Sequence, residues 1–488
     1  MRNKKDRLLI INRIRQLAAK KKERRQGRKK KARRQNQVLL PPPRVPRKIR
    51  RYKSSNKYFL PKKESKPLTQ IKSEFVKKYL PENLKYITET ENSPFNLNSI
   101  RKEKYKTDGV IKIPVNFSVL DNPDESFPVL RQLISALLLE DNDKVVFDYE
   151  KCQNIELSTQ ILVDIVLIDY YKLRKICKSI ERQKRDVFPI VGHINLINEN
   201  LLKLIYSVGS PVNLGIKQID FPDIVKCKLR IHNNRKEKDI EKLMAQKELD
   251  TTEMAEYIIE CMRKVNRKLS HEKLDDLCTV IGEILINAEE HSTTQHRFSI
   301  GYFKEENESG NHFGLFRLVI LNFGKTIYEK FKSVDCPNQE IVTQMNNLSV
   351  NFTKKSLFSS GEFEEESLWT LYALQEGVTS VLHESKKRGN GFIRFIESFY
   401  NIKDSNAVDN TTKMLLVSGR TRIIFDGKYS VENTIKTNGE QFKVMTFNDS
   451  KNIEDKPDKE CVLHSKNYFP GTMISAKILL NDENFKQI

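Results

Sequence analysis

From about residue 105 onward, the apolar residues follow two different periods, which predict strands alternating with helices. Short apolar runs predict strands over 109–120 and 143–155. Apolar positions spaced by three and four predict helices over 126–140, 158–177 and 198–209. Alternation of this kind favours a small α/β domain over 106–235.

A second pattern begins near residue 236 and mixes helices with antiparallel strands. A connecting helix is expected over 233–249, and Asp250 and Glu253 have the spacing of a capping box that starts the next helix. Ser270 is expected to cap a further helix. Residues 328–390 are expected to be irregular around one helix. The remaining predicted elements are helices over 271–292 and 391–401, strands over 297–303, 312–323 and 471–480, and a strand pair over 413–427. The sequence therefore predicts an α+β fold whose C-terminal part, 236–488, is a two-layer sandwich.

Charge is concentrated at the N-terminus. Residues 1–66 hold 27 Lys and Arg against three acidic residues, whereas the remaining chain is close to neutral. Like charges at this density and few apolar groups predict a disordered basic arm, followed by a polar linker over 67–105. Such an arm favours salt-sensitive binding of nucleic acid or another polyanion, with no base specificity implied. The alternative is a tail that only increases solubility.

The cysteines and the hydropathy indicate a cytoplasmic protein. Seven cysteines are scattered without a Cys-x-x-Cys pair, which argues against structural zinc and for reduced thiols. No apolar segment reaches the roughly 18 residues that span a bilayer, and no signal-peptide core is present. No membrane association is expected.

One predicted helix carries a stripe of residues suited to a phosphate and a metal. Glu283, Asn287 and His291 recur every four residues, so they share one helix face. A carboxylate can polarise a water, an amide oxygen can ligate Mg²⁺, and an imidazole can meet a phosphate oxygen. Many solvated helix faces have the same spacing, so further signals are needed.

The stretch Leu318 to Ile327 contains Gly-Lys-Thr after an apolar run, which superficially suggests a P-loop. A P-loop needs a glycine five residues before Gly324 so that backbone N–H groups can curl around phosphates. That position is Val319, within the strand. The P-loop interpretation is therefore excluded.

The order of four segments instead resembles the GHKL ATPase superfamily, which includes gyrase, histidine kinases and anti-sigma-factor kinases. "GEILINAEEHS" is similar to the N-box, "NFGKTI" stands where an adenine box is expected, "KRGNGFIRFIESF" resembles the glycine-rich end of the lid, and "FPGTMISAKILL" offers the closing Gly-Thr. The resemblance implies a Bergerat-type fold binding ATP and Mg²⁺, with Glu283 as catalytic base and Asn287 as Mg²⁺ ligand. It places nucleotide binding at Glu283, Asn287, His291, Asn322, Gly324, Ile327, Gly389, Gly391 and Thr472.

The adenine box departs from the family pattern. Asn322 replaces the expected aspartate, and Thr326 replaces the second glycine. A carboxylate accepts the adenine amino proton, whereas an amide can accept through its oxygen or donate through its NH₂. Nucleotide binding is therefore better supported than adenine selectivity.

Residues 106–235 resemble a STAS domain. In that family a partner kinase phosphorylates a serine or threonine in the loop before a helix, and Ser158 and Thr159 lie near that position. The alternative is that Ser158 simply caps the helix.

Three functions follow from these patterns. The first is an ATP-dependent regulatory switch with slow hydrolysis, whose lid controls binding of a protein partner or a polyanion. The second is a serine/threonine protein kinase of the anti-sigma type acting on a STAS partner. The third is a non-catalytic scaffold that binds nucleic acid. Homodimerisation is left open.

Overall fold

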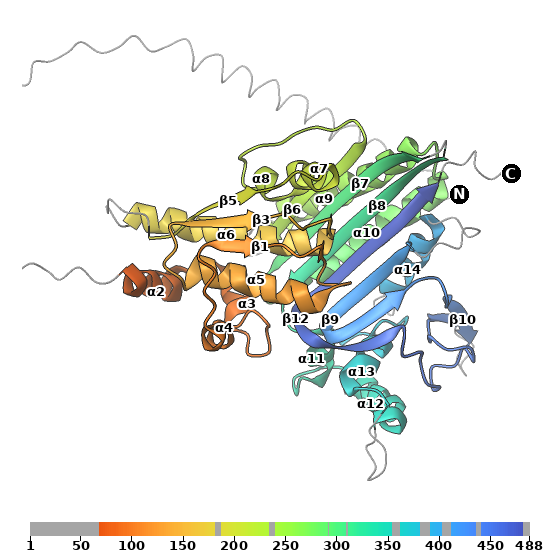
Figure 1. The fold of residues 1–488 in the computed structure, drawn as a ribbon. Helices are drawn as coiled ribbons and strands as arrows, with labels where there is room; N and C mark the ends of the chain where they lie inside the picture. The colour runs from red at the N-terminus through yellow and green to blue at the C-terminus, as the bar shows by residue number, and fades with distance from the viewer. Residues whose placement is uncertain are drawn as a thin grey trace, which may run out of the picture. The chain divides into compact units, whose positions relative to one another are not determined.

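The chain divides after Glu64, and every residue described here belongs to the second unit, Ser65–Ile488. The predicted basic arm lies outside the described residues. The described part is mixed α+β, as the sequence predicts (Figure 1). The computed structural model describes residues 68–180, 187–233, 240–290, 292–308, 311–353, 362–380, 391–402, 411–435 and 441–481.

The predicted polar linker over 67–105 is wrong, because this segment is helical and contributes to the core. Its three helices bury apolar residues that recur every three or four positions among the charges, such as Phe75, Leu84 and Ile100. Burial of such side chains outweighs the polar composition of the segment. The helices are α2 (Leu68–Tyr79), α3 (Glu82–Glu89) and α4 (Leu97–Glu103).

The α/β region that follows has the predicted alternation. Three parallel strands lie in the order β1-β3-β5, and a separate parallel pair is formed by β2 and β4. The strands are β1 (Val110–Lys112), β2 (Asn116–Phe117), β3 (Lys144–Asp148), β4 (Asn154–Ile155) and β5 (Ile190–Ile194). The helices are α5 (Pro123–Leu138), α6 (Leu157–Ile180), α7 (Glu199–Val208) and α8 (Ser210–Asn213).

A five-stranded antiparallel sheet forms the centre of the C-terminal part. Its order is β6-β7-β8-β12-β9. Strand β6 precedes the predicted domain boundary at 235, yet it pairs with β7. The predicted boundary therefore separates β6 from the sheet to which it belongs. The strands are β6 (Ile224–Asn233), β7 (His296–Glu308), β8 (Asn311–Phe323), β9 (Lys413–Phe425) and β12 (Val462–Asn481).

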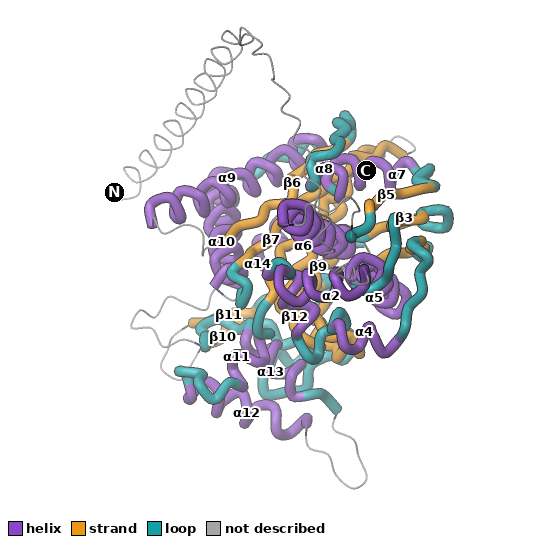
Figure 2. The backbone as a smooth tube through the Cα atoms, turned by 90° about the vertical axis from the view of Figure 1, so that its left-hand side faces the viewer, coloured by secondary structure: helices purple, strands orange, loops and turns teal. Residues whose placement is uncertain are grey.

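Three helices cover one face of this sheet: α9 (Ile240–Lys264), α10 (His271–Glu290) and α14 (Gly391–Ile402) (Figures 1 and 2). Ser270 caps α10 as predicted, since its Oγ accepts the Lys273 N–H at 3.3 Å. The capping box at Asp250 is wrong, because α9 runs through it without a break. The Asp250 carboxylate instead binds Arg297, which is a stronger partner than a free N–H.

The opposite face of the sheet packs against the N-terminal helices and strands. Side chains of alternate sheet residues, such as Val319, Leu321 and Met473, share one apolar cluster with residues of α5 and α6. The neighbouring residues Leu318, Ile320 and Ile474 lie in the cluster with the three helices. The sheet of the predicted two-layer sandwich is therefore covered on both of its faces, by the helices on one side and by the N-terminal α/β region on the other.

Two segments of the C-terminal part differ from the prediction. Residues 328–390 contain three helices among the described positions rather than one, and 413–427 forms one strand instead of a hairpin. Strand β9 continues through Gly419 and pairs with β12 on both sides of it, with a shift of register on each side of the Gly419–Phe469 pair. The remaining elements are α11 (Ile327–Lys332), α12 (Gln339–Thr353), α13 (Glu365–Ala373), β10 (Glu432–Ile435) and β11 (Gln441–Val444).

Candidate functional site

The ends of β8 and β12 bring two predicted segments into direct contact. Asn322 is the register partner of Thr472. The Gly324 N–H donates to the carbonyl of Pro470 at 3.2 Å. Gly471 allows this approach, because a Cβ there would lie 2.0 Å from the Asn322 carbonyl oxygen. Glycine at position 471 is therefore needed for close packing of these two backbones.

Ser418 of β9 links the same strand ends to the start of α11. Its hydroxyl accepts the Ile327 N–H at 2.9 Å and lies 3.1 Å from the Thr472 hydroxyl. Thr326 caps α11 through a capping box with Glu329. Sequence reasoning missed Ser418, since a serine within an apolar strand carries no signal until its neighbours are known. Four predicted residues, Asn322, Gly324, Ile327 and Thr472, thus lie within one hydrogen-bonded group.

The segment after α10 joins this group. The Thr293 N–H and the Ser292 hydroxyl both donate to the Phe323 carbonyl at 3.0 Å. The Lys325 N–H donates to the Thr293 hydroxyl at 3.2 Å. These bonds hold the C-terminal end of the helix that carries Glu283 and Asn287 against the end of β8.

Glu283 and Asn287 are both half-buried on α10, beside the apolar face that the sequence predicts. The Glu283 carboxylate lies 4.0 Å from the guanidinium of Arg394. Arg394 belongs to the first turn of α14, which begins at Gly391. The structure therefore brings Gly391 and Glu283 into the same neighbourhood. His291 and Gly389 lie outside the described residues.

The Asn322 side chain is buried at this junction. Asn322 alternates with Leu321, so its side chain lies on the helix-covered face with Ile320. It is only 2 % exposed, and its Nδ2 has no hydrogen-bond partner among the described residues. A buried amide donor without an acceptor costs about 1–3 kcal/mol, so such a group calls for an explanation.

A buried charged cluster fixes α10 to its neighbours. Arg297 of β7 is 2 % exposed, and its guanidinium lies 2.7 Å from the Asp250 carboxylate of α9 and 3.9 Å from the Glu289 carboxylate of α10. Lys247 and His232 approach Glu289 to 3.4 and 3.5 Å. Burial lowers the pKa of Arg297, and both carboxylates oppose that shift. The sequence indicated none of these pairings.

The two predicted phospho-acceptors are fully buried. Ser158 and Thr159 have no measurable exposure, and the Thr159 hydroxyl accepts the Val119 N–H at 2.7 Å. A partner kinase cannot reach either hydroxyl in this conformation. Helix α6 begins at Leu157, so Ser158 is not its cap.

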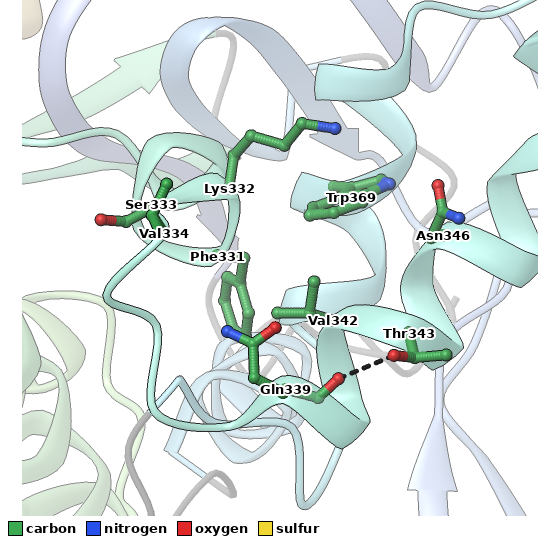
Figure 3. Close-up of a pocket in the computed structure, with 9 residues that line it drawn as sticks. All are labelled: Phe331, Lys332, Ser333, Val334, Gln339, Val342, Thr343, Asn346 and Trp369. Atoms are coloured by element: carbon green, nitrogen blue, oxygen red, sulfur yellow. Dashed lines mark hydrogen bonds between the residues drawn. The ribbon is translucent and has the colours of Figure 1, made fainter.

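A cavity of about 490 Å³ lies between α11, α12 and α13 (Figure 3). Phe331 and Trp369 form its apolar side, and Lys332 places its ammonium 4.8 Å from the centre of the Trp369 ring. None of the predicted site residues lines this cavity. Trp369 belongs to α13 and is buried.

Comparison with family models, curated proteins and solved structures found no match. Within the described ranges, no group of three or more His, Cys, Asp or Glu side chains is arranged to hold a metal ion. The described helices include none with the length and apolar character needed to cross a membrane.

Proposed function

We propose that the chain is an ATP-binding regulatory switch with slow Mg²⁺-dependent hydrolysis, built on a Bergerat-type fold. The order of segments in the sequence is the basis of this proposal. The antiparallel sheet with α9, α10 and α14 on one face agrees with that fold.

One observation carries the proposal: a buried amide nitrogen that has no partner among the described residues lies where the predicted segments meet. Asn322 Nδ2 faces the helix layer, beside the loop that ends α10 and the Gly-Thr of β12. A purine base offers ring nitrogens and exocyclic groups that could pair with such an amide.

The residues present suit a nucleotide in part. A helix of twelve residues begins at Gly391, and its first turn can receive a phosphate through backbone N–H groups. Asn287 would supply one oxygen to Mg²⁺, which keeps several waters and takes further oxygens from phosphates. When bound, the ion would neutralise charge on the phosphates. Glu283 would orient the attacking water, and the Arg394 guanidinium would hold the carboxylate in place.

Two alternatives remain proposals of lower rank. If Glu283 accepts a proton from a protein hydroxyl, the same site is that of a serine/threonine kinase acting on a STAS-type partner. If the fold has lost nucleotide binding, the chain is a scaffold that binds nucleic acid through residues 1–66.

Titration of the full chain with a fluorescent ATP analogue tests the proposal. We expect saturable binding that Mg²⁺ strengthens, and we expect Asn287→Ala to remove the Mg²⁺-dependent part. Asn200→Ala, an exposed amide on α7, is the matched control and should bind as the parent does. Labelled γ-phosphate then separates the alternatives: release as free phosphate supports the switch, and transfer to a partner protein supports the kinase. Absence of binding refutes both and supports the scaffold.

A further inference from the structure

Three cations lie side by side on neighbouring strands of the five-stranded sheet. Lys477 of β12 is the register partner of Arg317 on β8 and of Lys413 on β9. Because side chains alternate between the two faces of a sheet, these three lie on the face that packs against the N-terminal α/β region. Helix α10, which carries Glu283, covers the opposite face. Directly opposed side chains in an antiparallel sheet lie about 5 Å apart, and like charges in that position repel.

One carboxylate from the N-terminal region serves two of the cations in this area. Asp121 Oδ1 lies 2.8 Å from the Lys413 ammonium and 3.8 Å from the guanidinium of Arg422. Arg422 also donates to the Leu120 carbonyl. The side chains of Lys413 and Arg422 are 28 % and 21 % exposed, so solvent reaches this edge of the interface between the sheet and the N-terminal α/β region.

The second carboxylate is a weak counter-charge. Glu156, which immediately precedes α6, accepts a hydrogen bond from the Ser475 hydroxyl at 3.3 Å. Burial raises the pKa of Glu156 to about 7, although Arg317 opposes the shift. Near neutral pH this carboxyl is therefore only partly ionised. Arg317 and Lys477 have no ion pair closer than 4 Å with the described carboxylates.

The interface between the sheet and the N-terminal α/β region also contains polar atoms without a hydrogen-bond partner. Glu156 Oε2 and Arg422 Nε are buried without a hydrogen-bond partner among the described residues. The pKa of Lys477 is lowered, first by burial and then by the positive charges of Arg317 and Lys413. Four cations thus face two carboxylates, and one of these is only partly charged. An anion with several oxygens would offset the repulsion among the cations and accept a hydrogen bond from Arg422 Nε.

We propose that Arg317, Lys413, Lys477 and Arg422 bind a phosphate group between the sheet and the N-terminal α/β region. Phosphate suits this arrangement because its tetrahedral oxygens can meet donors from three strands at once, and a guanidinium can bind two of them together. All four ligands belong to strands of the sheet, so the phosphate would hold together the cationic side chains of β8, β9 and β12 beside the Asp121 carboxylate. This site lies on the sheet face opposite the proposed nucleotide site and does not depend on it.

Thermal unfolding of the full chain in increasing inorganic phosphate, at constant ionic strength with NaCl, tests the proposal. We expect the midpoint to rise with phosphate in the parent protein and the apparent Kd to weaken at least tenfold in Lys477→Met and in Arg317→Gln. In phosphate-free buffer, Lys477→Met should unfold at the parent midpoint or above it, because it removes an opposed charge. A purely structural role for Lys477 predicts a lower midpoint instead.

The control is Lys451→Met, which removes a 62 % exposed cation paired with Glu432. This variant should keep the full phosphate response. Residues 1–66 are present in every variant, so phosphate binding by them cannot account for a difference between the variants. A parallel titration with glycerol 3-phosphate distinguishes free phosphate from a phosphate monoester as the ligand. An equal response of the parent and Lys477→Met to both compounds, or no response in the parent, would overturn the proposal.

Discussion

Removal of the Arg297 side chain should destabilise the fold strongly, because it leaves the buried Asp250 carboxylate without its closest cation and removes a second cation from beside the buried Glu289. At an effective dielectric constant of about 20, attraction across the 2.7 Å and 3.9 Å contacts is roughly 6 and 4 kcal/mol. The cost of desolvating the ions offsets much of this attraction. Breaking a buried pair by removing one partner typically costs about 3–5 kcal/mol, and we expect Arg297→Leu to fall in that range.

Chemical denaturation followed by circular dichroism measures this loss. Arg263→Leu is the matched control on the same helix as Asp250. Its guanidinium also lies 2.7 Å from a carboxylate, that of Glu260, but its side chain is 73 % exposed. Exposed pairs contribute little, so the control should unfold at the parent midpoint. A loss below about 1 kcal/mol for Arg297→Leu would refute the argument that burial makes this cluster important.

Three further predictions concern the site and the α/β region. Gly471→Ala should lower stability by about 1–3 kcal/mol and perturb the end of β8, because the new Cβ would overlap the Asn322 carbonyl; unchanged unfolding would contradict the close approach. Asn322→Asp should raise the preference for ATP over ITP in competition binding, because a carboxylate only accepts hydrogen bonds; an unchanged ratio would remove Asn322 from base recognition. Burial raises the pKa of Asp164 to about 7, so the folded state binds a proton more tightly than the unfolded state, and stability should fall between about pH 4 and 7 by up to about 1.4 kcal/mol per pH unit. Asp164→Asn should flatten this slope in denaturation measured from pH 4 to 8, and an equal slope in both proteins would contradict the shift.

The predictions that succeeded depend on local patterns. Periodicity placed α5, α6, α10 and α14 within a few residues of their observed bounds, because one face of each helix is apolar. The predicted linker over 67–105 failed because its charged residues dominate the composition, while a few regularly spaced apolar residues are enough to pack three short helices.

In the candidate site, too, some predictions from the sequence succeeded and others failed. The sequence placed Asn322, Gly324, Ile327 and Thr472 in one site through segment order alone, and the structure brings these four together. Their joining residue, Ser418, lies more than ninety positions from Gly324, and no local pattern connects the two. The structure also buries Ser158 and Thr159, which the STAS resemblance placed near a phosphorylated position and which the alternative interpretation placed at a helix cap.

By itself, the sequence determined the α+β class, the basic character of residues 1–66 and the helix face that carries Glu283 and Asn287. These follow from composition and from the fixed geometry of helices and strands, which act over a few residues. Only the tertiary structure decided that β6 joins the C-terminal sheet, that Arg297 pairs with Asp250 and Glu289, and that Lys477 lies between Arg317 and Lys413. Such contacts depend on strand register and layer packing, because both bring together residues that are far apart along the chain.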